Sequence, residues 1–202
     1  MKELFHIIVE GLADLVFFEQ YYRHLFGKPA PKGFVFKTDG KDNLPKFANQ
    51  MRTMSANGGI NLVVFDADDD IEARRKELLS IKEQIGVEFE LFLLPNDKEA
   101  GALEDMLENI INPNNKPIFE CWEGYEKELV KLDIPGRTPP PLTTPAKKTK
   151  IYGYLEAYHG ETKREKELIK EANRNYADPR LWNLDAEYLG ALKGFLERDL
   201  KD

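Results

Sequence analysis

Cysteine and histidine are scarce in this sequence. Its 202 residues include one cysteine, Cys121, and three histidines. A single cysteine excludes an internal disulfide and any cysteine-based metal cluster, and three histidines are too few for a zinc site of the usual kind. The composition therefore fits a reducing environment and directs the search for a metal site toward carboxylates.

Long apolar runs are also missing. The first run, residues 4–9, contains His6, ends at Glu10 and is shorter than the hydrophobic region of a signal peptide. No other run approaches the length of a membrane span. We therefore expect a soluble cytoplasmic protein with no membrane partner.

Positive charge is in deficit, with a net charge of −7 and a pI near 5.2. Residues 1–110 hold 13 Lys/Arg against 20 Asp/Glu, whereas residues 111–202 hold 16 of each. Bulk positive charge therefore cannot hold nucleic acid, and any such contact must be local or bridged by a metal. The acidic excess is either a solvated surface or a cation-binding cluster, depending on where the carboxylates lie.

A hydrophobic content of 42% is enough for a folded core, and the apolar pattern of the first half alternates between two types of element. Short runs rich in β-branched residues predict strands at 4–9, 33–37, 60–65 and 89–94. Helical spacing between them predicts helices at 12–25, 44–56, 71–85 and 101–111. This order predicts an α/β fold with a mostly parallel four-stranded sheet flanked by helices.

The second half is predicted to be helical. Its helices are expected at 116–132, 147–159, 161–174 and 185–200. Between the first two, residues 134–145 contain five prolines in 12 residues, which favours an extended loop. We expect a core of residues 1–112 and a helical extension, residues 113–202, packed on that core.

Acidic residues alternate directly after the third predicted strand, at Asp66, Asp68 and Asp70. Carboxylate oxygens at a strand end are the ligands that Mg²⁺ prefers. Helix capping explains one or two such acids but not their alternation, so the metal interpretation is favoured. A calcium loop of the EF-hand type does not fit, because Ile71 stands where the sharp turn requires glycine.

A second acidic motif, VEGLAD, follows the first predicted strand. It places Glu10 at the strand end, Gly11 in the turn and Asp14 one turn into the next helix. In open α/β sheets, sites form at the carboxyl ends of the strands. If the first and third strands are neighbours, Glu10 and Asp66 are separated by roughly 5 Å, close enough to share one cation.

Together, EGxxD after the first strand and DxDxD after the third resemble the Toprim domain, a Rossmann-like fold, over about residues 3–112. This domain is shared by bacterial primases, topoisomerases and the overcoming-lysogenisation-defect (OLD) nucleases. The resemblance implies that Glu10 is a metal ligand or general acid/base and that Asp66 and Asp68 are metal ligands. It also implies a third acid at Asp70 and a supporting role for Asp14.

Two further segments extend the resemblance to the OLD-type nucleases. In GALEDML, Glu104 matches an acid that completes a second cation position, with Asp105 as a supporting acid, although a simple helix-start role fits equally well. OLD-type enzymes use a lysine beyond the acidic motifs, and Lys148 and Lys150, beside Lys147, are the local candidates; a solvated helix face is the alternative. Tyr154 belongs to a tyrosine series that either stacks on bases or packs in the core.

The resemblance implies phosphodiester chemistry on DNA or RNA that depends on Mg²⁺ or Mn²⁺, most simply a nuclease. It also leaves room for two protein partners, a separately encoded ATPase and a second copy of the chain in a homodimer. The rival interpretation is a non-catalytic module of the same fold that binds a cation and a partner. A phosphatase or receiver domain fits poorly, because its key aspartate would follow the first strand, where this chain has Glu10.

Overall fold

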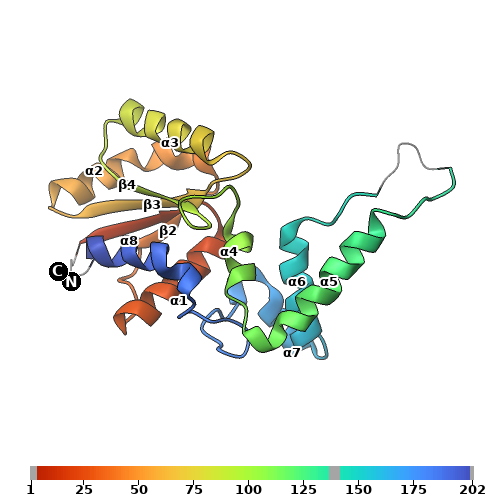
Figure 1. Ribbon diagram of the computed structural model, residues 1–202. Coiled ribbons are helices and arrows are strands. Elements are labelled where there is room, and N and C mark those ends of the chain that lie inside the picture. The colour runs from red at the N-terminus through yellow and green to blue at the C-terminus, as the bar shows by residue number, and fades with distance from the viewer. Residues whose placement is uncertain (1–3, 137–141, 201–202) are drawn as a thin grey trace.

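The computed structural model describes residues 4–136 and 142–200 (Figure 1). The strands are β1 (Phe5–Val9), β2 (Val35–Lys37), β3 (Ile60–Asp66) and β4 (Glu90–Leu94). The α-helices of the described residues are α1 (Leu12–Phe26), α2 (Ala48–Ala56), α3 (Ile71–Ile85), α4 (Leu103–Asn109), α5 (Lys116–Leu129), α6 (Lys147–His159), α7 (Lys163–Ile169) and α8 (Gly190–Leu200). The short 3-10 helices are η1 (Lys41–Phe47), η2 (Pro113–Asn115), η3 (Glu171–Asn173) and η4 (Glu187–Leu189).

The four strands form one parallel sheet in the order β2-β1-β3-β4. Helices connect successive strands, so the predicted α/β fold with a parallel four-stranded sheet is confirmed. The first and third strands are neighbours, which is the condition for Glu10 and Asp66 to approach each other, and Val9 pairs with Val64. The loops that follow β1 and β3 therefore begin at the same edge of the sheet.

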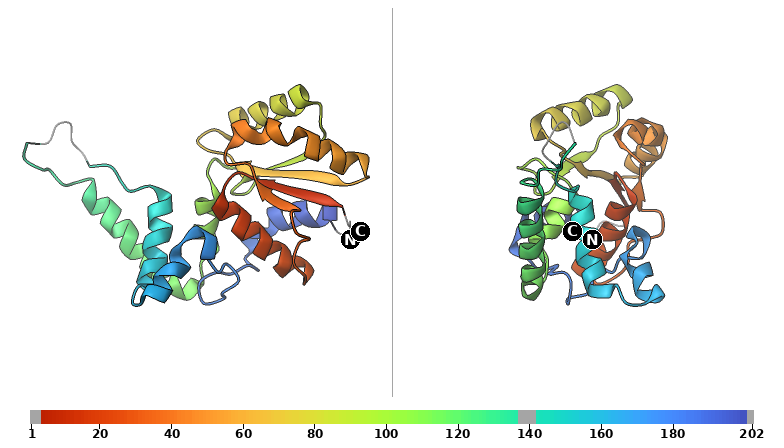
Figure 2. Two further views of the ribbon diagram at one scale, coloured as in Figure 1. Left: turned by 180° about the vertical axis from the view of Figure 1, so that it is seen from behind. Right: turned by 90° about the vertical axis from the view of Figure 1, so that its right-hand side faces the viewer.

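Helices cover both faces of the sheet (Figures 1 and 2). Ile8 and Val63 pack with Leu78 of α3 on one face. Ile7 and Val64, one residue away along each strand, belong to the hydrophobic cluster of the other face, which includes α1, α4 and α8. Alternate side chains point to opposite faces, so covering both faces explains why these strands read as unbroken apolar runs.

Helices α5 and α6 project from the sheet region, whereas α8 returns to it (Figures 1 and 2). The ring of Phe195 on α8 lies 5.3 Å from that of Phe92 on β4. Buried residues of α6, among them Ile151 and Tyr154, belong to the same hydrophobic cluster as α1 and α4. The second half of the chain thus shares a core with one face of the sheet.

Three predicted helices are each divided into two parts in the structure. The helix expected at 44–56 is divided into η1 and α2, with Pro45 inside η1. The helix expected at 161–174 ends at Ile169, because Lys170 has an extended backbone with ψ 138°. The helix expected at 185–200 consists of η4 and α8. Proline lacks an amide donor, which accounts for the first division.

Part of the predicted proline-rich loop 134–145 falls on residues 137–141, outside the described residues. Over the described ranges, no helix is both long enough and apolar enough to cross a membrane.

Candidate metal centre

The acidic site is built where β1 and β3 end. Glu10 directly follows β1, and Asp66 is the last residue of β3. Gly11 then serves as the N-cap of α1, and Asp14, three residues later, accepts a hydrogen bond from the N–H of Gly11, next to the strand end. Both predicted motifs therefore reach one edge of the sheet.

Asp14 is buried, with 7% of its surface exposed. Its Oδ2 accepts a hydrogen bond of 2.9 Å from the backbone N–H of Gly11, whereas its Oδ1 is buried without a hydrogen-bond partner. Burial raises the pKa of Asp14 to about 6, and the charges of Glu104 and Glu10 act in the same direction. A buried acceptor without a donor is costly, so this oxygen is suited to a ligand that supplies positive charge.

Asp66 is the most perturbed acid of the site. Burial raises its pKa to about 8, and the negative charges of Asp14, Glu10 and Glu104 add to the shift. A hydrogen bond of 3.0 Å from the backbone N–H of Leu103 to Oδ1 only partly offsets it. Burial and the charges of neighbouring acids thus disfavour the ionised form of Asp66, a situation that a divalent cation would relieve.

Glu104 and Lys148 connect this space with the helical extension. Glu104 is in the first turn of α4, and its charge raises the pKa of both Asp14 and Asp66. Lys148, on α6, forms an ion pair with Glu171, which raises the pKa of the lysine; Glu104 adds a smaller contribution in the same direction. Lys148 therefore lies within electrostatic range of Glu104.

Glu10 and Asp68 share a basic partner, Arg74. Its Nη2 is 2.9 Å from Oε2 of Glu10 and 3.2 Å from Oδ2 of Asp68. Its Nε donates to the backbone carbonyl of Asp66 at 2.9 Å. Asp68 has a left-handed backbone with φ 53°, and its N–H and carbonyl pair with the carbonyl and N–H of Gly101. The loop after β3 is therefore fixed from two sides.

Asp70 and Asp105, also predicted at the site, act as helix caps. Oδ1 of Asp70 accepts hydrogen bonds from the N–H groups of Glu72 and Ala73 at the start of α3. Oδ2 of Asp105 accepts a hydrogen bond of 2.8 Å from the N–H of Ala102, and its Oδ1 forms an ion pair with Lys147. Both acids thus take the helix-capping role that the sequence left open as an alternative to metal binding.

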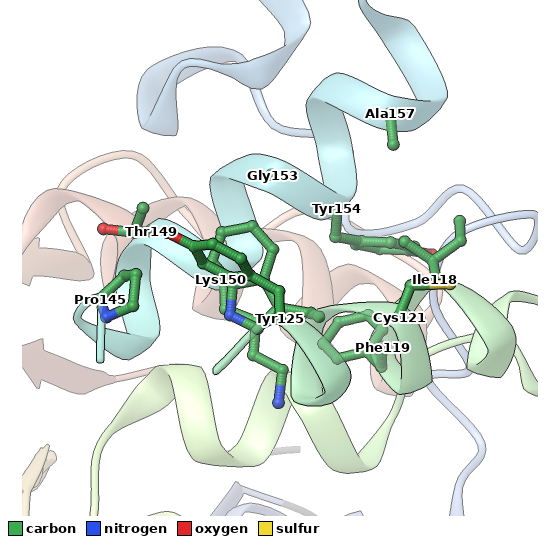
Figure 3. Close-up of a pocket in the computed structure, with 11 residues that line it drawn as sticks. Ile118, Phe119, Cys121, Tyr125, Pro145, Thr149, Lys150, Gly153, Tyr154 and Ala157 are labelled. Atoms are coloured by element: carbon green, nitrogen blue, oxygen red, sulfur yellow. The ribbon is translucent and has the colours of Figure 1, made fainter. Parts of the chain in front are cut away.

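Lys150 lies in a groove between α5 and α6, lined by the residues drawn in Figure 3, with a volume of about 510 Å³. Its Nζ is 2.9 Å from Oε2 of Glu108 and lies over the ring of Phe119. Tyr154, from the same helix, is buried and donates to the carbonyl of Leu181. Lys150 thus ties α6 to α4, and Tyr154 forms its hydrogen bond within the extension.

The oxygen donors of this site suit a hard divalent cation. In the described part of the chain, however, no three His, Cys, Asp or Glu side chains are arranged as a ready coordination shell. The unpartnered Oδ1 of Asp14 and the mutual repulsion around Asp66 fit a cation, so we consider Asp14, Asp66 and Glu104 the residues that would close on it.

The sequence matches a known protein family over nearly all of its length. A family model described as "Protein of unknown function (DUF3226)" matches residues 5–200. The chain belongs to this family. No curated protein and no solved structure matched the sequence. The match covers the sheet and the helical extension together, so the DUF3226 unit includes both the acidic edge and α4 to α8.

Two arginines and a tyrosine of this DUF3226 chain complete the site's surroundings, and sequence reasoning missed all three. Arg74 lies in a charged run that reads as a solvated helix face. Tyr176 is buried, and burial raises its pKa to about 12, with smaller contributions from Asp14 and Glu104. Arg174 is buried, stacks on Tyr152 and contacts the hydroxyl of Tyr176 at 3.5 Å. No local pattern connects Arg174 and Tyr176 with acidic motifs so far away in the sequence.

Proposed function

We propose that this protein hydrolyses phosphodiester bonds of DNA or RNA with Mg²⁺ or Mn²⁺ as cofactor. The observation that carries the proposal is the environment of Asp66. It is a carboxyl with a pKa raised to about 8, surrounded by the charges of Asp14, Glu10 and Glu104 at the carboxyl edge of a parallel sheet. Strongly perturbed acids at such an edge are typical of functional sites.

When bound, a divalent cation would neutralise the scissile phosphate and lower the pKa of a water molecule. Asp14, Asp66 and Glu104 would hold it through carboxylate oxygens. We assign Glu10 as the general base that takes the proton of the attacking water, because Arg74 holds its carboxyl group in a fixed position. We assign Lys148 to the substrate phosphate, where its ammonium would stabilise developing negative charge.

The net charge of −7 is compatible with a polyanionic substrate under this proposal. A metal ion at Asp66 reverses the sign of the local field, so the phosphate would be attracted at one point of an otherwise acidic surface. We therefore expect nucleic-acid binding that requires the cation and weakens as salt is added.

The direct test is cleavage of labelled single-stranded and double-stranded DNA and RNA with Mg²⁺ or Mn²⁺. Wild-type protein should cut at least one of them, and Glu10→Gln and Asp66→Asn should not. Asp70→Asn is the matched control, because asparagine preserves the helix cap while removing a neighbouring acid. Equal activity in all four proteins would mean that the cleavage comes from elsewhere and would reject the assignment.

One observation favours a second function, a non-catalytic module that binds a cation and a partner. Arg74 already compensates Glu10 and Asp68 within the protein, as it would in a site that no longer carries out chemistry. The two functions differ in a simple measurement. A non-catalytic module would retain oligonucleotides in the presence of Mg²⁺ without cutting them, and Asp66→Asn would abolish retention.

A further inference from the structure

A buried guanidinium lies between two of the predicted metal ligands. Nη2 of Arg74 is within 3.2 Å of a carboxylate oxygen of both Glu10 and Asp68. Only 4% of the arginine side chain is exposed, so these carboxylates, rather than water, compensate its charge. A single nitrogen thus occupies the place that a cation bridging Glu10 and Asp68 would take.

The other contacts of Arg74 fix it in this place. Its Nε donates to the carbonyl of Asp66, which ties the first turns of α3 to the end of β3. Its Nη1 is 3.4 Å from Oε2 of Glu77, and Lys41 holds the same carboxylate at 2.7 Å and 2.8 Å. A guanidinium remains protonated throughout the pH range of a folded protein, so this is a permanent positive charge.

The remaining acids of the site have no such compensation. Among the described residues, neither Asp14 nor Asp66 forms an ion pair. Oδ1 of Asp66 accepts only from the N–H of Leu103, and Oδ1 of Asp14 is buried without a partner. The site is therefore divided into a half already occupied by an internal cation and a half that lacks one.

We infer that Arg74 is a resident cation that replaces a second metal ion, so that the site binds one divalent ion, at Asp14, Asp66 and Glu104. The inference rests on the proposed function for the presence of a metal. Two-metal sites hold two ions side by side. Arg74 contacts Glu10, Asp68 and the carbonyl of Asp66, so its guanidinium would stand in for one of the two ions. It is a positioning residue, because it is buried and acts by holding Glu10 and the loop after β3.

The test is the number of Mn²⁺ ions bound per chain, measured by titration with electron paramagnetic resonance of the free and bound ion. Wild-type protein should bind one ion without Mn–Mn coupling. Arg74→Gln frees Glu10 and Asp68 and should bind two coupled ions, whereas Arg74→Lys retains a positive charge and should bind one. Arg75→Gln is the matched control on the same helix, because Arg75 pairs with Asp97 instead, and it should also bind one.

The exposed Asp68 supplies a second variant that does not depend on the folding of Arg74→Gln. Because Arg74 already engages Asp68, Asp68→Asn should leave Mn²⁺ affinity unchanged. A loss of about tenfold or more, the range expected when a residue supports a metal, would overturn the inference. Two coupled ions in the wild type, or one ion in a folded Arg74→Gln protein, would overturn it and leave the proposed function standing. No bound ion in the wild type would reject both.

Discussion

The backbone N–H of Leu103 donates a hydrogen bond of 3.0 Å to Oδ1 of Asp66, although the two residues are 37 positions apart. This bond joins the end of β3 to the start of α4. It orients one oxygen of a carboxylate whose pKa is raised to about 8 by burial and by neighbouring acids. The acidic edge is thus built by three segments, those that follow β1, β3 and β4.

The raised pKa of Asp66 makes stability depend on pH. Between its ordinary value of 3.8 and about 8, the folded protein holds a proton that the unfolded chain releases. The free energy of unfolding therefore falls as the pH rises through this window. Asp66→Asn cannot ionise, so it should be more stable than the wild type at the upper end, by about 1–3 kcal/mol, and the difference should shrink toward acidic pH.

Thermal unfolding followed by circular dichroism across the same window checks this prediction. Mg²⁺ should raise the melting temperature of the wild type near the upper end of the window and leave that of Asp66→Asn unchanged. A wild-type protein that gains stability as the pH rises would show that Asp66 ionises normally.

Asp70 should matter for stability and not for the metal. Its Oδ1 caps α3, so Asp70→Ala should lower the free energy of unfolding by about 1 kcal/mol. Asp70→Asn retains an acceptor and should cost much less. Denaturant unfolding and Mn²⁺ titration of both variants make the comparison, and weaker Mn²⁺ binding in Asp70→Asn would restore Asp70 as a ligand.

Glu104 and Glu108 lie one turn apart on α4 and should behave differently. Glu104→Gln removes an acid whose charge acts on Asp66, and Mg²⁺ affinity should fall by about tenfold. Glu108→Gln leaves the buried Lys150 without its ion pair, so it should reduce stability while preserving Mg²⁺ affinity. Calorimetric titration and urea unfolding of the two variants separate these effects, and identical behaviour would contradict the placement of Glu104.

Gly101 should be intolerant of a side chain. Its φ is 144°, and a Cβ there would lie 2.6 Å from Oδ2 of Asp105. Gly101→Ala should therefore destabilise the protein by about 1–3 kcal/mol and loosen the pairing with Asp68 that fixes the acidic loop. Gly124→Ala is the control, because Gly124 lies inside α5 in open space and alanine favours the helix by up to about 1 kcal/mol. Urea unfolding should show opposite signs.

Much of the sheet could be predicted from the sequence. The apolar runs marked all four strands, and the two acidic motifs indicated the correct edge, because carboxyl ends of parallel strands meet there. The site's internal arrangement could not be predicted. The spacing of Asp66, Asp68 and Asp70 favours ligands but leaves a helix cap open for one or two of them, and the direction of each side chain decides its role.

Arg74 escaped prediction for a related reason. In the sequence it belongs to a run of charged residues on α3, and such runs are normally solvated. Its side chain instead folds back over the strand end, where the carbonyl of Asp66 and the carboxylate of Glu10 accept its hydrogen bonds. Tyr176 and Arg174 were missed because their place beside α6 and near the acids depends on the path of the extension.

The most direct test of a cation site at Asp66 is calorimetric titration of Mg²⁺ and Mn²⁺ at neutral pH. The proteins to compare are the wild type, Asp66→Asn and the Asp66→Asn, Asp68→Asn double variant. We expect the wild type to bind one ion, Asp66→Asn to lose that binding, and the double variant to behave like Asp66→Asn. Equal binding by all three proteins, or none by the wild type, would contradict a cation site at Asp66.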